Sequence, residues 1–123
     1  MSDPRKRLGR WGEDLAARHL RQAGLTIITC NYRCAAGEMD IVAQDGDTWV
    51  FVEVKTRRGT AFGRPEDAIT RAKAGRLLQI AESYLQEHGL VDVDWRVDMI
   101  AVELDQRGKL LRVEQLPNAV TGW

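Results

Sequence analysis

Two charged side chains in an otherwise apolar segment are the first candidates for chemistry in this sequence. In WVFVEVKT, residues 49–56, the two-residue repeat of a strand places on one face Trp49, Phe51, Glu53 and Lys55. Valines occupy the other face, and a segment that is apolar on both faces is typical of a strand buried within a sheet. A carboxylate and an ammonium group are costly to bury there, so they indicate a function.

A second carboxylate reaches the same face if the preceding turn is a two-residue hairpin loop. Asp45-Gly46 is a strong signal for such a loop. A loop of these two residues pairs Asp40 with Phe51, which places Asp40 on the face of Glu53 and Lys55, with Glu38 opposite Glu53. A three-residue loop would turn Asp40 to the other face, so the predicted convergence depends on the length of the loop.

Carboxylates held this close repel each other unless a cation lies between them. Hard oxygen ligands without His or Cys select Mg²⁺ or Mn²⁺, and the predicted ligands are Asp40, Glu53 and the backbone carbonyl of Val54. Lys55 is predicted to keep its proton, because nearby negative charge favours the ammonium form more than modest desolvation opposes it. It would then stabilise charge on a phosphorane and orient the attacking water.

Positive charge is concentrated directly after this segment, although the whole chain has a formal net charge of zero. Residues 55–76 contain seven basic and two acidic side chains, a net charge of +5. Such a block is either a solvated face or, because arginine suits phosphate, a surface for nucleic acid. The candidates for nucleic-acid contact are Arg57, Arg58, Arg64, Lys73 and Arg76.

The chain that must position these groups has 123 residues, of which 44% are hydrophobic, so a single domain over residues 1–123 is predicted. No apolar run is as long as a membrane span, and the charged N-terminus does not resemble a secretory signal. We therefore expect a cytoplasmic protein without a membrane partner. The two cysteines, Cys30 and Cys34, are expected to form neither a zinc site nor a disulfide.

Apolar periodicity predicts helices over residues 6–23 and 65–88, and strands over residues 25–33, 38–44, 48–56, 93–104 and 109–116. The order αβββαββ predicts an α/β fold with a mixed sheet flanked by helices. Gly9 and Gly12 leave one side of the first helix open to close packing or to a ligand. Three tryptophans are predicted to be core residues rather than base-stacking platforms: Trp11, Trp49 and Trp95.

Three short motifs carry a family resemblance: GE at residues 12–13, GEMDIV at residues 37–42 and VFVEVKTR at residues 50–57. Together they resemble the YraN family of bacterial nuclease-like proteins, within the PD-(D/E)XK superfamily and its restriction-endonuclease-like fold. The likeness continues through residues 63–85 and 95–100, so it covers nearly the whole chain. One departure is Met39, which stands where the name-giving proline would be.

The resemblance implies roles for four residues. In that superfamily the matching aspartate, glutamate and lysine, here Asp40, Glu53 and Lys55, hold a metal ion and cleave phosphodiesters. A helical glutamate, here Glu13, completes the site in archaeal Holliday-junction resolvases, whose layout this sequence also resembles. Without the resemblance, Glu13 is equally well explained as a solvated helix charge.

Two functions are consistent with these observations. The leading hypothesis is a Mg²⁺-dependent or Mn²⁺-dependent endonuclease that acts on DNA, including branched or structured DNA. The alternative is a nucleic-acid-binding module that keeps the nuclease fold without turnover. The sequence leaves open whether the nucleic acid is DNA or RNA. A homodimer would suit a two-fold symmetric junction, but no residue demonstrates one.

Overall fold

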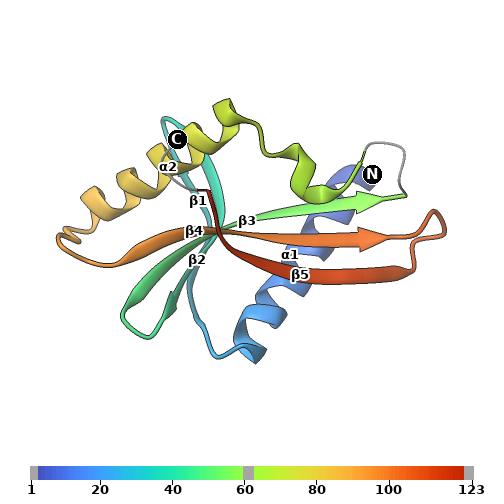
Figure 1. The fold of residues 1–123 in the computed structure, drawn as a ribbon, viewed down its shortest axis with the longest axis horizontal. Helices are drawn as coiled ribbons and strands as arrows, with labels where there is room; N and C mark the ends of the chain where they lie inside the picture. The colour runs from blue at the N-terminus through green and yellow to red at the C-terminus, as the bar shows by residue number, and fades with distance from the viewer. Residues whose placement is uncertain (1–2, 60–62, 121–123) are drawn as a thin grey trace.

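A five-stranded mixed sheet with a helix on each face forms the fold of the computed structural model, which describes residues 3–59 and 63–120 (Figure 1). The elements in chain order are α1 (Pro4–Gln22), β1 (Thr26–Cys34), β2 (Gly37–Asp45), β3 (Thr48–Arg58), the 3₁₀ helix η1 (Pro65–Ala68), α2 (Arg71–Glu87), β4 (Trp95–Leu104) and β5 (Leu110–Val120). This arrangement confirms the predicted α/β class and element order. No helix in the described ranges is long and apolar enough to cross a membrane.

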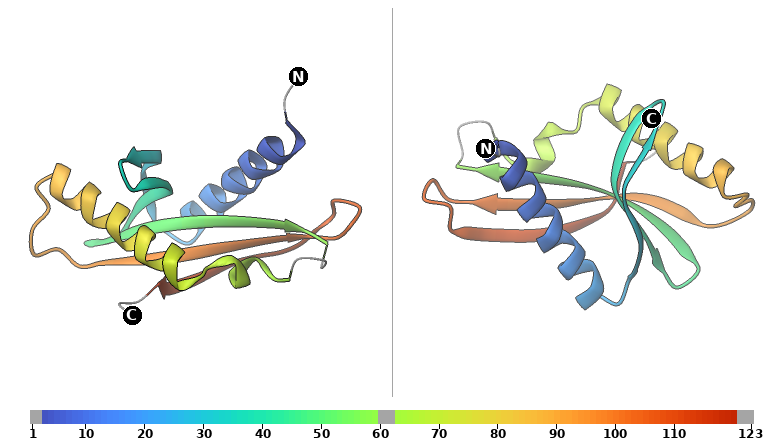
Figure 2. Two further views of the ribbon diagram at one scale, coloured as in Figure 1. Left: turned by 90° about the horizontal axis from the view of Figure 1, so that it is seen from above. Right: turned by 180° about the vertical axis from the view of Figure 1, so that it is seen from behind.

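Strand order in the sheet follows the chain, from β1 at one edge to β5 at the other. All neighbouring strands are antiparallel except β3 and β4, which are parallel. A parallel pair requires a crossover connection, and η1 with α2 supplies it. The opposite face is crossed by α1, as the view from behind shows (Figure 2). The middle of β3, which carries Glu53, Val54 and Lys55, therefore lies between the two helices.

Each face of the sheet has its own hydrophobic core, as the alternation in β3 predicts. Val50, Val52 and Val54 pack with Ala16 and Leu20 of α1. Phe51 on the other face packs with α2 residues, including Leu77, Ile80 and Tyr84. Burial on both faces explains why β3 is almost continuously apolar, and it makes the polar groups at its end exceptional.

The β2–β3 hairpin differs from the predicted register by two residues. Asp45 pairs with Thr48, so the loop consists of Gly46 and Asp47 rather than Asp45 and Gly46. Gly46 has φ of +60°, which glycine adopts without the steric cost of a side chain. The predicted pairing of Asp40 with Phe51, and the placement of Glu38 opposite Glu53, are therefore wrong. A shift of two residues keeps the same faces, because the side-chain repeat is also two.

Pairing between β2 and β3 ends at Ile41 and Val52, and Asp40 lies where the two strands separate. Asn31, opposite this position in β1, has φ of +57°, which marks a bend in the β1–β2 hairpin. Beyond the bend, Met39 joins the core on the α2 face, whereas Ile41 belongs to the α1 face. The bend therefore interrupts the alternation of faces beside Asp40.

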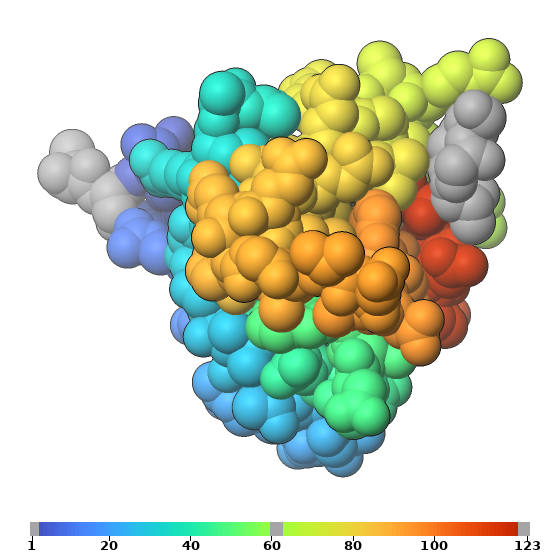
Figure 3. All heavy atoms as spheres, turned by 90° about the vertical axis from the view of Figure 1, so that its left-hand side faces the viewer, coloured from blue at the N-terminus to red at the C-terminus, as the bar shows by residue number. Residues whose placement is uncertain are grey.

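The tip of this hairpin rests against α2, where the space-filling view shows the two segments side by side (Figure 3). The Tyr32 hydroxyl lies 3.1 Å from the Ser83 hydroxyl oxygen, and the Tyr32 and Tyr84 rings pack edge to face with centroids 5.1 Å apart. The contact holds the hairpin away from β3. A cleft can therefore open at the separation point.

The predicted continuous helix over residues 65–88 is interrupted. The short η1 ends at Ala68, Ile69 is extended, and α2 begins at Arg71. Thr70 caps α2, because its hydroxyl oxygen accepts a hydrogen bond from the Lys73 backbone N–H at 3.2 Å. A capping threonine is thus the local cause of the break.

The prediction that three tryptophans are core residues holds for two of them and is wrong for the third. Trp49 and Trp95 pack against the α2-face core, as predicted. Trp11 does not, because 40% of its surface is exposed. Both cysteines are free: Cys30 is exposed and Cys34 is half-buried.

Gly12, which follows Trp11 in α1, allows the helix to approach the sheet closely. Because Gly12 faces the sheet, Trp11 faces the side of the helix and stays partly exposed. A Cβ atom on Gly12 would overlap the Thr56 side chain, whereas a Cβ on Gly9 would meet nothing within 4 Å. Gly12 therefore serves close packing, and Gly9 leaves open space beside the candidate site.

Candidate active site

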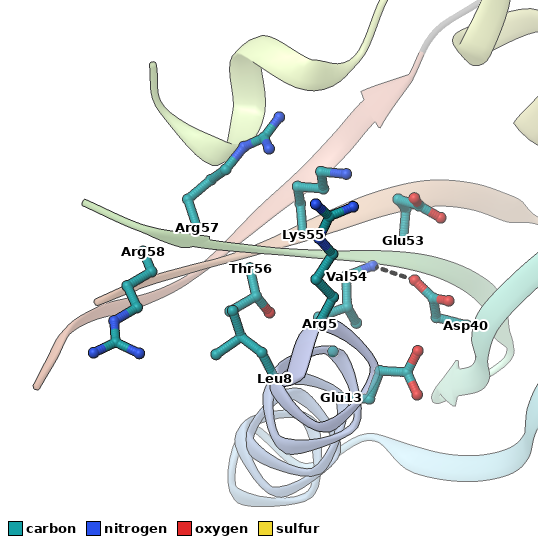
Figure 4. A pocket seen from close by; sticks show the side chains of 11 residues that line it. Arg5, Leu8, Glu13, Asp40, Glu53, Val54, Lys55, Thr56, Arg57 and Arg58 are labelled. Atoms are coloured by element: carbon teal, nitrogen blue, oxygen red, sulfur yellow. Dashed lines mark hydrogen bonds between the residues drawn. The ribbon is translucent and has the colours of Figure 1, made fainter. Parts of the chain in front are cut away.

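A cavity of about 500 Å³ lies between the N-terminal half of α1 and the end of β3 (Figure 4). The predicted site residues that line it are Glu13 from α1, Asp40 from β2, and Glu53, Val54 and Lys55 from β3. The structure thus brings together residues that are up to 42 positions apart in the chain. Three elements are needed to assemble the group, and β3 supplies its centre.

Asp40 occupies the point where β2 leaves β3. One of its carboxylate oxygens, Oδ2, accepts a hydrogen bond from the Val54 backbone N–H at 2.7 Å. A side chain thereby satisfies a donor of β3 at a place where pairing between the backbones has ended. The bond fixes the Asp40 carboxylate against β3, beside Glu53 and the Val54 peptide (Figure 4).

The electrostatic environment of Asp40 strongly favours its neutral form. Burial is the main cause, and repulsion from Glu53 is the next, and together they raise the pKa of Asp40 to about 8. The hydrogen bond from Val54 opposes the shift but does not cancel it. The carboxyl group is therefore both desolvated and close to other negative charge.

Glu13 belongs to the same electrostatic group. Burial raises the pKa of Glu13, and repulsion from Glu38, Asp14 and Glu53 raises it further. Repulsion from Glu13 in turn contributes to the raised pKa of Asp40. The two carboxyl groups are therefore electrostatically linked inside the cavity.

Glu53 has a partner that the sequence did not indicate. Its carboxylate forms an ion pair with the Lys73 ammonium at 2.9 Å, and only 12% of the Glu53 side chain is exposed. Lys73, predicted to contact nucleic acid, comes from the first turn of α2, directly after the Thr70 cap. The break between η1 and α2 thus places a cation on one of the site carboxylates.

The predicted charge balance at Lys55 is wrong in direction. Burial lowers the pKa of Lys55, repulsion from Lys73 and Arg57 lowers it further, and Glu53 and Asp40 only partly oppose the shift. Because Glu53 is paired with Lys73 and Asp40 favours its neutral form, little negative charge remains to hold the Lys55 proton. Lys55 therefore releases its proton more readily than an ordinary lysine.

Three arginines line the cavity beside the acidic group: Arg5, Arg57 and Arg58. Sequence reasoning missed Arg5, although a signal was present, since Arg5, Gly9 and Glu13 recur every four residues and so share one helix face. The Nε atom of Arg57 is buried and has no hydrogen-bond acceptor among the described residues. Such a donor is costly to leave unpaired, which suits an anion that is not part of the chain.

The other predicted nucleic-acid contacts lie outside this cavity. Arg64 forms an ion pair with Asp67 at 3.2 Å. Arg76 is exposed on α2, with its aliphatic part beside Gly37 at the tip of the β1–β2 hairpin. The +5 block is therefore divided in space: Arg57 and Arg58 line the cavity, while Arg64 and Arg76 do not.

The fit of these residues to a metal ion depends on their donor atoms. Within residues 3–59 and 63–120, no group of three or more His, Cys, Asp or Glu side chains is arranged to hold a metal ion. The donors at the site are carboxylate and carbonyl oxygens, which suit Mg²⁺ or Mn²⁺, and repulsion between Asp40 and Glu53 is one cause of the raised pKa of Asp40. The chemistry fits a hard divalent cation, provided that Glu53 turns from Lys73 toward it.

Comparisons with known proteins agree on one family. The sequence model of "Uncharacterised protein family UPF0102" matches residues 12–102. A UPF0102 protein of Desulfitobacterium hafniense (strain Y51) is 49% identical over 113 residues, covering 89% of this chain and 92% of that protein. Similar proteins occur in Roseiflexus castenholzii, 43% identical with 98% of each chain covered, and in Syntrophotalea carbinolica, 46% identical with 100% of each covered.

Proposed function

The chain belongs to the UPF0102 (YraN) family, whose description assigns no activity, and we propose a function from the residues of its own site. We propose that the protein is a metal-dependent endonuclease. It hydrolyses phosphodiester bonds of DNA, including branched or structured DNA. One observation carries the proposal. Glu13, Asp40 and Glu53 form an acidic group inside a cavity that four basic residues also line: Arg5, Lys55, Arg57 and Arg58. Basic side chains suit phosphate, and clustered carboxylates beside phosphate require a cation between them.

The residues that would hold the cation are Asp40, Glu53 and the backbone carbonyl of Val54. A bound Mg²⁺ or Mn²⁺ supplies a Lewis acid for the phosphoryl oxygens and lowers the pKa of a coordinated water. Asp40 is held ready by the Val54 N–H at 2.7 Å. Lys73 competes for Glu53 and neutralises it when no other cation is present.

The remaining side chains can bind and orient the substrate. Arg5, Arg57 and Arg58 offer guanidinium groups to phosphates on either side of the bond that is cleaved. Lys55 can donate a hydrogen bond to a phosphoryl oxygen or to the attacking water, and its lowered pKa makes transfer of a proton to the leaving oxygen easier. Glu13, whose pKa is raised by burial, can accept a proton from that water.

A second function is favoured by the Glu53–Lys73 ion pair. A lysine that permanently satisfies Glu53 would leave no second carboxylate for a metal ion, while the arginines could still bind phosphates. The protein would then be a catalytically inactive nucleic-acid-binding module with the same fold. This alternative predicts binding of DNA or RNA without metal-dependent turnover.

A substrate panel separates the two functions. Purified protein is incubated with labelled single-stranded, duplex, flap and four-way-junction DNA, and with matched RNA, in Mg²⁺, Mn²⁺ or EDTA. We expect metal-dependent cleavage that is lost in Lys55→Ala and retained in Glu82→Gln, a control on the exposed side of α2. Binding without cleavage of any substrate would contradict the endonuclease and support the binding module. Equal cleavage by Lys55→Ala would refute the assigned site.

A further inference from the structure

A second groove adjoins the candidate active site. It has a volume of about 480 Å³ and lies between the N-terminal half of α1 and the ends of β3 and β4. The residues that define this groove, called the Trp11 groove below, include Arg7, Trp11 and Leu104 together with three that also line the active-site cavity: Arg5, Leu8 and Arg58. The two spaces therefore adjoin along these three residues, and a chain-like ligand that follows their surface can contact both.

An aromatic side chain forms one wall of the groove. Trp11 is 40% exposed, and it lies one turn of α1 from Leu8 on the same face of the helix. Gly12, the next residue, faces the sheet and contacts Thr56, which turns Trp11 to the side of the helix instead of into the core. A large indole surface is thus held open to solvent on a rigid helix.

The groove also carries arginines that no described carboxylate pairs with. None of Arg5, Arg7 and Arg58 forms an ion pair with a residue in the described ranges. Arg58 is oriented nonetheless, because its Nε donates a hydrogen bond to the Gln106 carbonyl at 3.1 Å. An indole flanked by arginines fits a ligand that combines a planar ring with anionic groups.

We propose that the Trp11 groove binds an unpaired nucleobase of the substrate, stacked on the Trp11 indole, with its flanking phosphates on Arg7 and Arg58. The proposal rests on the proposed function in one respect, since it takes the ligand of the adjoining cavity to be nucleic acid. A base within a duplex is already stacked and offers no free face, whereas an unpaired base does. The preferred substrate therefore has a single-stranded segment next to the phosphodiester that lies in the active site.

Matched oligonucleotides test the base separately from the phosphates. The first is a blunt DNA duplex, the second carries a single-stranded thymidine tail, and the third carries an abasic tail of the same length and charge. Affinities are measured by fluorescence anisotropy in EDTA, so that cleavage plays no part. Base stacking on one aromatic residue should make wild type bind the thymidine tail about 5- to 100-fold more tightly than the abasic tail.

Variants then assign that preference to Trp11. Trp11→Ala should bind the thymidine and abasic tails equally while keeping its affinity for the blunt duplex, and Trp11→Phe should restore most of the difference. Val91→Ala, at a residue 76% exposed near the C-terminal end of α2, serves as the control. Quenching of tryptophan fluorescence by the thymidine tail should be weaker in Trp11→Phe than in wild type.

Each outcome decides something specific. If wild type binds duplex but does not distinguish the two tails, or if Trp11→Ala keeps the distinction, the groove does not hold a base and only this inference fails. If wild type binds none of the three DNAs, nor the corresponding RNAs, the proposed function fails with it. If Trp11→Ala does not fold, two measurements still test whether the groove binds a base. They are the affinity of wild type for the two tails and the fluorescence quenching of Trp11→Phe compared with wild type.

Discussion

Two clusters of three carboxylates lie in this protein, and they are neutralised very differently. Glu66, Glu103 and Glu114 surround Arg112, whose guanidinium reaches them at 2.7, 2.8 and 2.7 Å. Glu13, Asp40 and Glu53 surround the candidate cavity and have no comparable central cation among the described residues. The first cluster shares one cation of the chain, whereas in the second Lys73 forms an ion pair with Glu53 alone.

The pKa values express the same difference. The hydrogen bond from Arg112 lowers the pKa of Glu66, so folding stabilises its charged form. Burial and repulsion raise the pKa of Asp40 to about 8, so folding disfavours its charged form. The Arg112 cluster joins η1 to β4 and β5 and serves the fold. A cluster that costs stability, by contrast, is a mark of a functional site.

The largest expected effect separates chemistry from binding at Asp40. Asp40→Asn keeps the shape of the side chain but removes a charge that would hold the metal ion, so cleavage in Mg²⁺ should fall by several orders of magnitude, about 10³-fold or more. Affinity for DNA in EDTA should stay level at pH 7, where Asp40 is already mostly neutral, and rise above pH 8, where the substitution removes a negative charge. Asp67→Asn, an exposed carboxylate outside the cavity, is the matched control. Equal cleavage by Asp40→Asn and wild type would show that Asp40 is not a ligand of the metal ion.

The second prediction concerns stability and pH. Because the pKa of Asp40 is raised on folding from 3.8 to about 8, the folded protein binds more protons than the unfolded chain between these values. The free energy of unfolding should therefore decrease as pH rises from about 4 to 8, by a contribution on the order of 5 kcal/mol from this group. Urea titrations of wild type and Asp40→Asn in EDTA would measure it.

The variant and the metal ion provide the controls for that measurement. Asp40→Asn should show a shallower decrease of stability across the same pH range. Adding Mg²⁺ to wild type should stabilise it most at pH 8, where the carboxylates are most charged. A wild-type stability that does not change between pH 4 and 8 in EDTA would show that the acidic cluster is neutralised within the chain, like the Arg112 cluster.

The smallest effect is expected at Arg112 itself. Arg112→Met should lower the free energy of unfolding at pH 7 by about 2 kcal/mol, because three partly buried carboxylates lose their shared partner. Lowering the pH toward 4 should recover part of this loss, since protonation removes the repulsion. Arg107→Met, in the exposed β4–β5 turn, is the control. A stability loss no larger than that of the control would make the Arg112 cluster a set of weak surface pairs.

The sequence by itself determined the features that depend on local rules. Alternation in residues 49–56 predicted a strand that is buried on both faces and places Glu53 and Lys55 on one face. Turn residues predicted the β2–β3 hairpin, and a register error of two residues left the faces unchanged as far as the two strands pair, up to Ile41 and Val52. These results follow from backbone geometry and side-chain size. Both act over a few neighbouring residues, so their effects can be predicted from the sequence.

Only the tertiary structure decided how the charges of the site are balanced. Lys73 reaches Glu53 from α2 because Thr70 begins a new helix, and the loss of that negative charge contributes to the lowered pKa of Lys55. Trp11 is exposed because Gly12 turns it aside, a consequence of contact with Thr56 44 residues away in the chain. Solvation and Coulomb energies depend on distances through space between elements, and no local pattern of residue types contains those distances.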